Sequence, residues 1–423
     1  MKYLIILTIY LLSYSNSFGQ TWQVINGSDF VTNSSEAFGS VPYVNKYFQI
    51  NPYDNSIWFS LSTPPMGVRV LDTNGFYQEF DYQNNATFNG TFGLEFGDFA
   101  FTTDNVFTYH QNIGLYSYNG SNWSIESASI NGCDIYAQKD TVWMAITSAP
   151  FLKWVNGSIT PSTISGLRRI RSKNGIFWAS TGTTNIILTY DSINGSLYYS
   201  PDTTNLLSWN NYDFKFSKRT DSLYSASDQG ISIAYDGIFV DSITPSNSIN
   251  MPSAGIIEFE FDSLDNIWAI FAPDFSIANK PTAIGYYDKS LNTWTNIYTS
   301  SNSILDFNRR MTIEVDNQNN PWICDASNIY VLKVGNLPQW LGIDENEQSK
   351  IKIYPNPTSE FVTIKIEDNI KITNLNLLDV SGKQVMPIDS SSSVIDIYSL
   401  RKGVYFLVIN YDGGVLTKKI IKN

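Results

Sequence analysis

Asn266-Ile267-Trp268-Ala269 places a turn residue before an aliphatic, an aromatic and a small residue, and this pattern recurs along the chain. Six further copies lie at residues 55–58, 105–107, 141–145, 176–179, 222–226 and 320–323. The aromatic residues of the copies are separated by 49, 36, 35, 46, 44 and 54 residues, an average of 44. Such a period is typical of four-stranded propeller blades and not of helical repeats. The sequence therefore predicts an all-β fold with a seven-bladed β-propeller.

Tight turns accompany the repeat with the same regularity. A type I′ hairpin turn needs positive φ at both central residues, which Asn-Gly and Asp-Gly adopt at low steric cost. Such dipeptides stand at residues 74–75, 119–120, 156–157, 194–195 and 236–237. A long β-sandwich is the alternative, because sandwiches also place turns about every 8 to 12 residues. A sandwich, however, does not require one common period.

Length and charge favour two domains. The chain has 423 residues, and single cores rarely exceed about 250 to 300 residues. Residues 349–423 hold 10 basic and 7 acidic residues (net +3), which leaves residues 1–348 with 17 basic and 32 acidic residues (net −15). An acidic body repels phosphate, so the composition argues against nucleic acid and against anionic membranes as partners.

The first 19 residues have the organisation of a signal peptide. Lys2 precedes an apolar run over residues 3–12, and Ser17 and Gly19 occupy the positions that a signal peptidase reads. The run is shorter than the about 20 apolar residues that span a bilayer, and no later stretch reaches that length. We therefore expect no transmembrane segment, and passage through the periplasm to the outer cell surface or the extracellular space.

The seventh copy of the repeat lacks an outer strand. After Gly335-Asn336 the chain runs into the acidic, polar residues 342–349, which are predicted to be a linker. Residues 21–26 have an outer-strand pattern like that of residues 294–298 but belong to no complete copy. We expect this N-terminal strand to pair with the last blade, because closure removes an exposed strand edge. The propeller then spans residues 20–341.

Residues 350–423 are predicted to form a second, smaller domain. Short alternating runs separated by turn residues predict an immunoglobulin-like β-sandwich there. Three motifs and a basic end follow one another along it. They consist of Tyr354, Pro355, Asn356 and Pro357; Asp379, Gly382 and Lys383; Gly403 and Tyr405; and Lys418 and Lys419.

These motifs resemble the type A C-terminal sorting domain of the type IX secretion system of Bacteroidota. The resemblance implies export by that machinery, and its alternative is an immunoglobulin-like module without a sorting role. The body resembles the two-component-regulator type of propeller repeat, in which a turn such as Asp265-Asn266 precedes the aromatic strand and a Trp such as Trp123 or Trp294 marks the outer strand. That resemblance concerns the fold and not the ligand.

The sequence offers little for catalysis or metal binding. His110 is the only histidine, and a lone histidine on a predicted strand is expected to be a packed or surface residue. Propeller lyases that resemble the streptogramin-inactivating family use several acid-base groups with a metal, which this chain does not reproduce. Asp and Asn residues at 262–266 and 316–320 could hold Ca²⁺, but they also cap tight turns. We therefore expect no catalytic residue, no metal and no cofactor.

Two further sets of side chains stand out. Cys133 and Cys324 are predicted on distant blades, so both are expected to be buried free thiols and not a disulfide.

Three arginines interrupt the acidic body: Arg169 and Arg171 on the predicted innermost strand of blade 4, and Arg310 before the innermost strand of blade 7. They could bind a carboxylate-bearing sugar or peptide terminus through bidentate contacts. Their alternative role is to form ion pairs with neighbouring loop carboxylates.

Three functions remain open at this point. The favoured one is a secreted or cell-surface binding module for a glycan or a protein, without enzymatic activity. The second is a polysaccharide hydrolase or lyase that uses carboxylates alone, and the third is a structural surface protein. Fold by itself does not choose among them.

Overall fold

A computed structural model of the chain describes residues 22–26, 48–61, 67–72, 77–81, 83–88, 96–110, 113–128, 132–146, 149–173, 176–181, 187–191, 196–198, 206–208, 211–235, 238–272, 280–325, 327–334, 351–366, 372–379, 383–389, 392–411 and 414–423. The predicted signal peptide (residues 1–19) and linker (residues 342–349) lie outside the described residues. The chain divides into two compact units, Met1–Leu337 and Pro338–Asn423. Each unit is described by itself.

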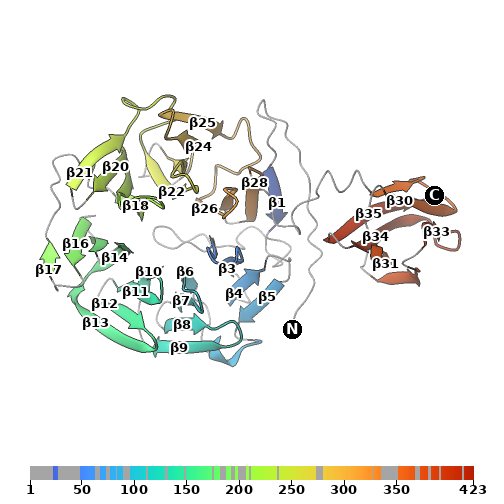
Figure 1. The fold of residues 1–423 in the computed structure, drawn as a ribbon, viewed down its shortest axis with the longest axis horizontal. Helices are drawn as coiled ribbons and strands as arrows, with labels where there is room; N and C mark the ends of the chain where they lie inside the picture. The colour runs from blue at the N-terminus through green and yellow to red at the C-terminus, as the bar shows by residue number, and fades with distance from the viewer. Residues whose placement is uncertain are drawn as a thin grey trace. The chain divides into compact units, whose positions relative to one another are not determined.

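The first unit is a β-propeller, which confirms the predicted fold class. Its described residues form seven four-stranded sheets, and Figure 1 shows the sheets following one another around a ring. A short 3-10 helix, η3 (Ala86–Phe88), lies between the first and second sheets in the sequence. The sheets are called blades 1 to 7 below, in the chain order of their innermost strands.

Each blade is an antiparallel meander. The innermost strands are β2 (Phe48–Ile50), β6 (Phe96–Phe101), β10 (Gly132–Gln138), β14 (Leu167–Lys173), β18 (Asn211–Phe216), β22 (Ile256–Phe261) and β26 (Met311–Val315). The second strands are β3 (Ile57–Leu61), β7 (Val106–His110), β11 (Thr141–Ile146), β15 (Ile176–Thr181), β19 (Leu223–Ser227), β23 (Ile267–Phe271) and β27 (Pro321–Asp325). The third strands are β4 (Gly67–Leu71), β8 (Gly114–Tyr118), β12 (Pro150–Val155), β16 (Ile187–Asp191), β20 (Gly230–Tyr235), β24 (Ala283–Asp288) and β28 (Asn328–Leu332). The outer strands are β5 (Tyr77–Asp81), β9 (Trp123–Ala128), β13 (Ser158–Ser165), β17 (Ser196–Tyr198), β21 (Ile238–Ile243), β25 (Thr293–Tyr298) and β1 (Trp22–Asn26).

The ring closes through the N-terminal strand. β1 pairs antiparallel with β28 over five residue pairs, from Trp22 opposite Leu332 to Asn26 opposite Asn328. Blade 7 therefore takes its outer strand from the start of the chain and its other three strands from the end of the propeller. This pairing covers an edge of β28 that would otherwise be open to association with other chains.

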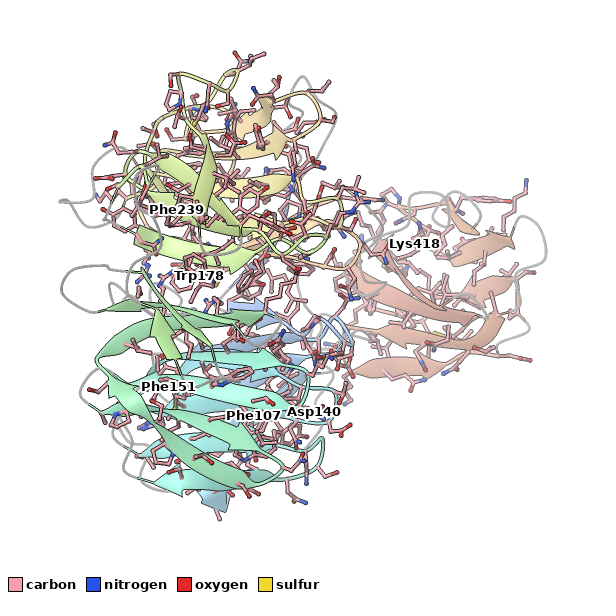
Figure 2. The ribbon with its side chains drawn as sticks, turned by 60° about the vertical axis from the view of Figure 1, so that its left-hand side comes forward. Phe107, Asp140, Phe151, Trp178, Phe239 and Lys418 are labelled. Carbon is pink, nitrogen blue, oxygen red and sulfur yellow. The ribbon has the colours of Figure 1, made fainter. Side chains whose placement is uncertain are left out.

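The core lies between neighbouring blades and is largely aromatic. Phe107 on β7 lies 4.6 Å from Trp154 on β12, measured between ring centroids, and Trp178 on β15 lies 6.1 Å from Phe239 on β21. Figure 2 labels Phe107, Phe151, Trp178 and Phe239, all of them buried. The aromatic residues of the repeat thus join one sheet to the next, each large side chain contributing roughly 1.5 to 3 kcal/mol by leaving water.

The second unit is a β-sandwich, as predicted. One sheet has the order β29 (Ile351–Tyr354), β30 (Phe361–Ile366), β33 (Val394–Asp396). The other has the order β32 (Gln384–Pro387), β31 (Ile372–Leu378), β34 (Gly403–Tyr411), β35 (Gly414–Lys422). Their facing sides bury apolar residues such as Val362, Leu377 and Leu407.

Candidate functional site

Polar side chains on the innermost strands bind several blades to the next one along the ring. The N–H of Ile170 on β14 donates to Asp134 Oδ2 on β10 at 2.7 Å. In the same way the N–H of Ile313 donates to Glu258 Oε1 at 3.1 Å. Two further bonds of this kind join Phe259 N to Asp213 and Phe99 N to Gln49. The acceptor occupies an equivalent position in each innermost strand. In the neighbouring blade, the donor is the residue that directly follows this same position. The position, which we call the clamp position, is held by Gln49, Asp98, Asp134, Arg169, Asp213, Glu258 and Thr312.

A β-bulge shapes the strand at this position in several blades. The pairing of innermost and second strands shifts register immediately before Asp134, Arg169, Asp213 and Glu258. A bulge leaves one residue out of the ladder and redirects the side chains that follow it. Here it accompanies a bond from the clamp position to the neighbouring blade.

Arg169 occupies the clamp position of blade 4, where the other blades carry Gln, Asp, Glu or Thr. A guanidinium cannot accept an N–H, so the bond is reversed: Arg169 Nη1 donates to Asp213 Oδ1 of blade 5 at 2.9 Å. Arg171 reaches in the other direction and donates to Asp134 Oδ2 of blade 3 at 2.7 Å. The two arginines therefore hold blade 4 between its neighbours.

The surroundings of Arg171 are those of a structural ion pair. Its guanidinium lies 5.6 Å from the ring centroid of Tyr136 and 5.8 Å from that of Phe214. Burial alone lowers the pKa of Arg171, but the charges of Asp134 and Asp213 raise it above its ordinary value. The Arg171 side chain is 14% exposed and that of Arg169 is 21% exposed. Removing one member of such a buried pair costs about 3 to 5 kcal/mol, because the other charge is left without a partner.

The sequence-predicted site residues do not form one cluster. Arg169 and Arg171 lie on one face of β14, as their alternation predicts, with Ile170 buried between them. Their carboxylate partners stand on innermost strands and not on loops. Arg310 is half-buried and precedes β26, three blades further along the ring. A role of these three residues in ligand binding remains a prediction.

Hairpins between the innermost and second strands form a set of linked turns, which we call the turn rim: residues 51–56, 102–105, 139–140, 217–222, 262–266 and 316–320. Asp316 shows how one turn is built. Its Oδ1 accepts the N–H groups of Gln318 and Asn320, and its Oδ2 accepts from Asn320 Nδ2 and Trp322 Nε1, all at 2.8 to 2.9 Å. These are the turn bonds expected for the Asx clusters.

Neighbouring turns of the rim also bind each other. Ser263 N donates to Asn319 Oδ1 at 2.8 Å, which joins blade 6 to blade 7. Asn317 Nδ2 donates to the carbonyl of Pro52 at 2.9 Å, which joins blade 7 to blade 1. The acceptor Asn319 has φ of 65°, a left-handed conformation that Asn tolerates. The rim therefore combines turns on the surface with a backbone fixed by bonds within and between blades.

Exposed apolar side chains project from this rigid rim. Tyr53 is 50% exposed and Leu264 is 59% exposed. Partial burial and the charge of Asp140 raise the pKa of the Tyr53 hydroxyl above its ordinary value, so Tyr53 is a neutral hydrogen-bond donor at physiological pH. Exposed amide side chains, Asn317 and Gln318, lie on the same rim. An aromatic ring beside amides and carboxylates is suited to a ligand that has both apolar faces and hydroxyl groups.

His110 and the cysteines belong to the packed interior where they are described. His110 on β7 is buried against Phe96, with ring centroids 4.9 Å apart. Cys324 is a buried free thiol, and burial together with nearby Asp325 and Glu258 raises its pKa well above the ordinary value. The side chain of Cys133 lies outside the described residues. Within the described ranges, no three His, Cys, Asp or Glu side chains gather as metal ligands would.

In the second unit the described motif residues lie in turns and on strands of the sandwich. Asn356 Oδ1 accepts the N–H of Ile421 at 2.8 Å. Asp379 N donates to the carbonyl of Lys383 at 2.9 Å and closes a turn, while Gly382 lies outside the described residues. Tyr405 OH donates to the carbonyl of Arg401 at 2.8 Å.

The basic end of the motif set lies on β35. Lys418 stands opposite Leu407, and Lys419 stands opposite Phe406. Lys418 is half-buried, and this burial lowers its pKa from the ordinary value. Figure 2 places Lys418 in the second unit. The basic end is therefore a strand of the folded sandwich.

The clamp position is a structural feature that sequence reasoning missed. Its signal is present, because a polar residue followed by an aliphatic or aromatic residue stands 9 to 11 residues before every aromatic residue of the repeat. Examples are Asp98-Phe99 before Phe107 and Asp134-Ile135 before Trp143. The variety of residue types at the position, from Gln to Arg, conceals the pattern.

Comparison with protein families confirms the sorting domain. Residues 352–423 match the secretion system C-terminal sorting domain, Por_Secre_tail. A comparison with characterised protein sequences finds no match. The chain is thus a propeller protein with a sorting tail that directs it to the cell surface or the extracellular space.

Solved structures with similar folds are propellers. PorZ, a bacterial surface component of the type IX secretion system of Porphyromonas gingivalis, is 14% identical with a TM-score of 0.52, over 91% of this chain and 60% of PorZ. The extracellular domain of the hybrid two-component system BT3049 of B. thetaiotaomicron is 12% identical with a TM-score of 0.53, over 98% of this chain and 61% of that one. A streptogramin B lyase is 13% identical with a TM-score of 0.53, over 75% of this chain and 99% of the lyase.

These likenesses concern the fold alone, given the low identities. The chain spans about three fifths of the length of the first two structures. In the parts of the chain that the structure describes, no helix is long and apolar enough to cross a membrane.

Proposed function

We propose that this protein is a non-enzymatic binding module that the type IX secretion system exports through the periplasm, and that its turn rim binds an extracellular glycan. The observation that carries the proposal is the exposure of Tyr53 and Leu264 on turns whose backbone is fixed by hydrogen bonds. A fixed surface loses little conformational entropy on binding, so more of the contact energy appears as affinity.

The chemistry of the rim favours a sugar over other ligands. The ring of Tyr53 can lie against the apolar face of a sugar, while neighbouring Asn317 and Gln318 can bond its hydroxyl groups. The acidic body disfavours polyanions. Protein capture is the alternative use of the same surface.

The inner-strand arginines support a different role. Arg169 and Arg171 are each bound to a buried carboxylate of a neighbouring blade. A carboxylate-bearing ligand would have to compete with Asp213 and Asp134 for them. We assign these arginines to cohesion of the ring, with anion binding as the competing prediction.

The test is a glycan and polysaccharide array probed with the mature chain from Gln20, scored for retention and for product release. Tyr53→Ala is expected to weaken retention by about tenfold or more, as removal of an aromatic contact at a binding centre does. The control is Tyr235→Ala, because Tyr235 is similarly exposed but lies on the outer hairpin of blade 5. The arginine role is tested by Arg169→Ala, which should lower the melting temperature without abolishing retention.

The other outcomes identify the other functions. Product release would overturn the proposal in favour of a carboxylate-based hydrolase or lyase. Stable self-association at micromolar concentration without retention would favour a structural surface protein. Equal retention by Tyr53→Ala and wild type would exclude the turn rim as the binding surface.

A further inference from the structure

The first sorting motif and the end of the chain are bonded to each other across 65 residues of sequence. Asn356 Oδ1 accepts the N–H of Ile421 at 2.8 Å. Thr358 N donates to the carbonyl of Ile421 at 2.9 Å, and Asn423 N donates to the carbonyl of Thr358 at 2.9 Å. We call residues 356–359 and 421–423, with these bonds, the C-terminal latch.

The latch fixes the last residues of the chain within the fold. Thr358 is 7% exposed and Lys422 is 8% exposed, and the two form a parallel β-bridge. Lys422 Nζ donates to the carbonyl of Ser359. A buried ammonium needs such acceptors, because burying it without one is costly. The basic end is therefore held as structure and does not form a free tail.

The latch also joins the two sheets of the sandwich at one strand edge. β35 pairs along its length with β34 on one side. On its other side, among the described residues, it meets residues 356–358 at its very end. The contact thus connects the sheet that starts at β29 with the sheet that ends at β35.

The motif side chains at the latch face outward and leave the core to other residues. Tyr354, Pro355, Asn356 and Pro357 are exposed, whereas the core of the sandwich consists of residues such as Val362 and Leu407. The motif therefore contributes a surface beside the end of the chain. Exposed residues on a rigid support are suited to recognition.

Resting on the proposed function, we propose that the export machinery recognises one composite surface, formed by residues 354–359 together with residues 418–423, and not a linear basic tail. Asn356 is then a positioning residue that keeps the two segments together. The partner is a protein surface of the secretion machinery that fits both segments at once. Loss of the latch separates the two halves of this surface while every basic residue remains present.

The experiment compares variants of the full chain in a type IX-competent Bacteroidota host. Loss of one hydrogen bond shifts a local equilibrium by about two- to tenfold, so Asn356→Ala is expected to lower the exported fraction by up to that factor, with accumulation in the periplasm. Asn356→Asp keeps the acceptor and should be exported like the wild type. The matched control is Asn374→Ala, an exposed Asn on β31 outside the latch.

Hydrogen exchange shows whether the latch itself has opened. The amides of Ile421 and Asn423 should exchange faster in Asn356→Ala by a similar factor, while the interior of the β34–β35 ladder at Leu407 stays protected. An open latch with unchanged export would overturn the composite surface and favour a linear tail.

A second variant decides the question if Asn356→Ala unfolds the sandwich. Deleting Asn423 removes its bond to Thr358 but leaves Lys418, Lys419 and Lys422 in place. A composite surface predicts reduced export of this variant, whereas a linear basic tail predicts export equal to that of the wild type. Equal export of the wild type from a strain without type IX secretion would instead refute the proposed function, so the two failures are distinguishable.

Discussion

Replacing Trp22 by Ala tests whether the N-terminal strand holds the propeller closed. Trp22 is 5% exposed on β1, and its ring meets that of Tyr298 on β25 edge-on at 5.2 Å. It shares a buried cluster with residues of blades 6 and 7, among them Trp268 and Leu332. Truncating a buried Trp to Ala removes its contacts and leaves a cavity, which costs about 3 to 5 kcal/mol.

This cost converts into a measurable change in the melting temperature. An unfolding entropy of about 2.1 cal/mol/K per residue, over the about 310 residues of the propeller, gives about 0.65 kcal/mol/K. Trp22→Ala should therefore melt about 5 to 8 °C below the wild type in near-UV circular dichroism. Deleting residues 22–26 should lower the melting temperature further, because all five pairs with β28 are lost.

Two controls make the result interpretable. Tyr235→Ala changes an exposed aromatic residue and should shift the melting temperature by less than about 1 °C, as surface substitutions do. Trp58→Ala removes a buried Trp from blade 1, a blade built from consecutive strands, and should cost about as much as Trp22→Ala. Wild-type melting of both Trp22→Ala and the deletion would refute closure by β1.

Three further predictions concern the interior of the propeller. Asp134→Ala removes the acceptor of both Ile170 N and Arg171 Nη1 and should destabilise the chain by about 3 to 5 kcal/mol in urea unfolding, whereas Asp134→Asn, which keeps an acceptor, should cost less. Burial raises the pKa of the Asp325 carboxyl, so the folded state binds that proton more tightly than the unfolded chain, and the contribution to stability is present at low pH and is lost as pH rises through the raised pKa. The melting temperature of Asp325→Asn should therefore rise relative to that of the wild type as pH increases from about 3 to 7. A difference between the two melting temperatures that does not change with pH would contradict this. The raised pKa of buried Cys324 predicts that, in a Cys133→Ser background, maleimide labels the folded chain only as fast as it unfolds; fast labelling at pH 8 would contradict the burial.

The fold followed from local sequence patterns to a large extent. The short apolar runs, which are buried throughout in strands such as Ile267–Phe271, and the turn residues beside them are encoded within each hairpin, so the second strands could be located without any tertiary information. The Asx clusters were likewise interpretable, since Asp316 bonds residues two and four positions away. Each such feature depends on residues close in sequence.

The charged residues show where that reasoning stops. Arg169 and Arg171 were found as an anomaly, but their partners are 44 and 37 residues away, on blades 5 and 3. Spacing within one strand fixes the face on which a side chain lies and leaves open which neighbouring strand supplies the opposite charge. The sequence around an arginine does not show whether its guanidinium binds a ligand or a buried carboxylate of the protein, because both can accept its hydrogen bonds.

The sequence by itself determined that this is a β-propeller followed by a β-sandwich with sorting motifs, because strand period, turn chemistry and short motifs act over a few residues. Only the tertiary structure decided the register in which β1 pairs with β28, the bonds by which the clamp position joins one blade to another, and the contact of Asn356 with Ile421. The physical reason is the range of the interactions. Hydrogen bonds and ion pairs act over about 3 Å in space, whatever the distance along the chain, so only folding brings those partners together.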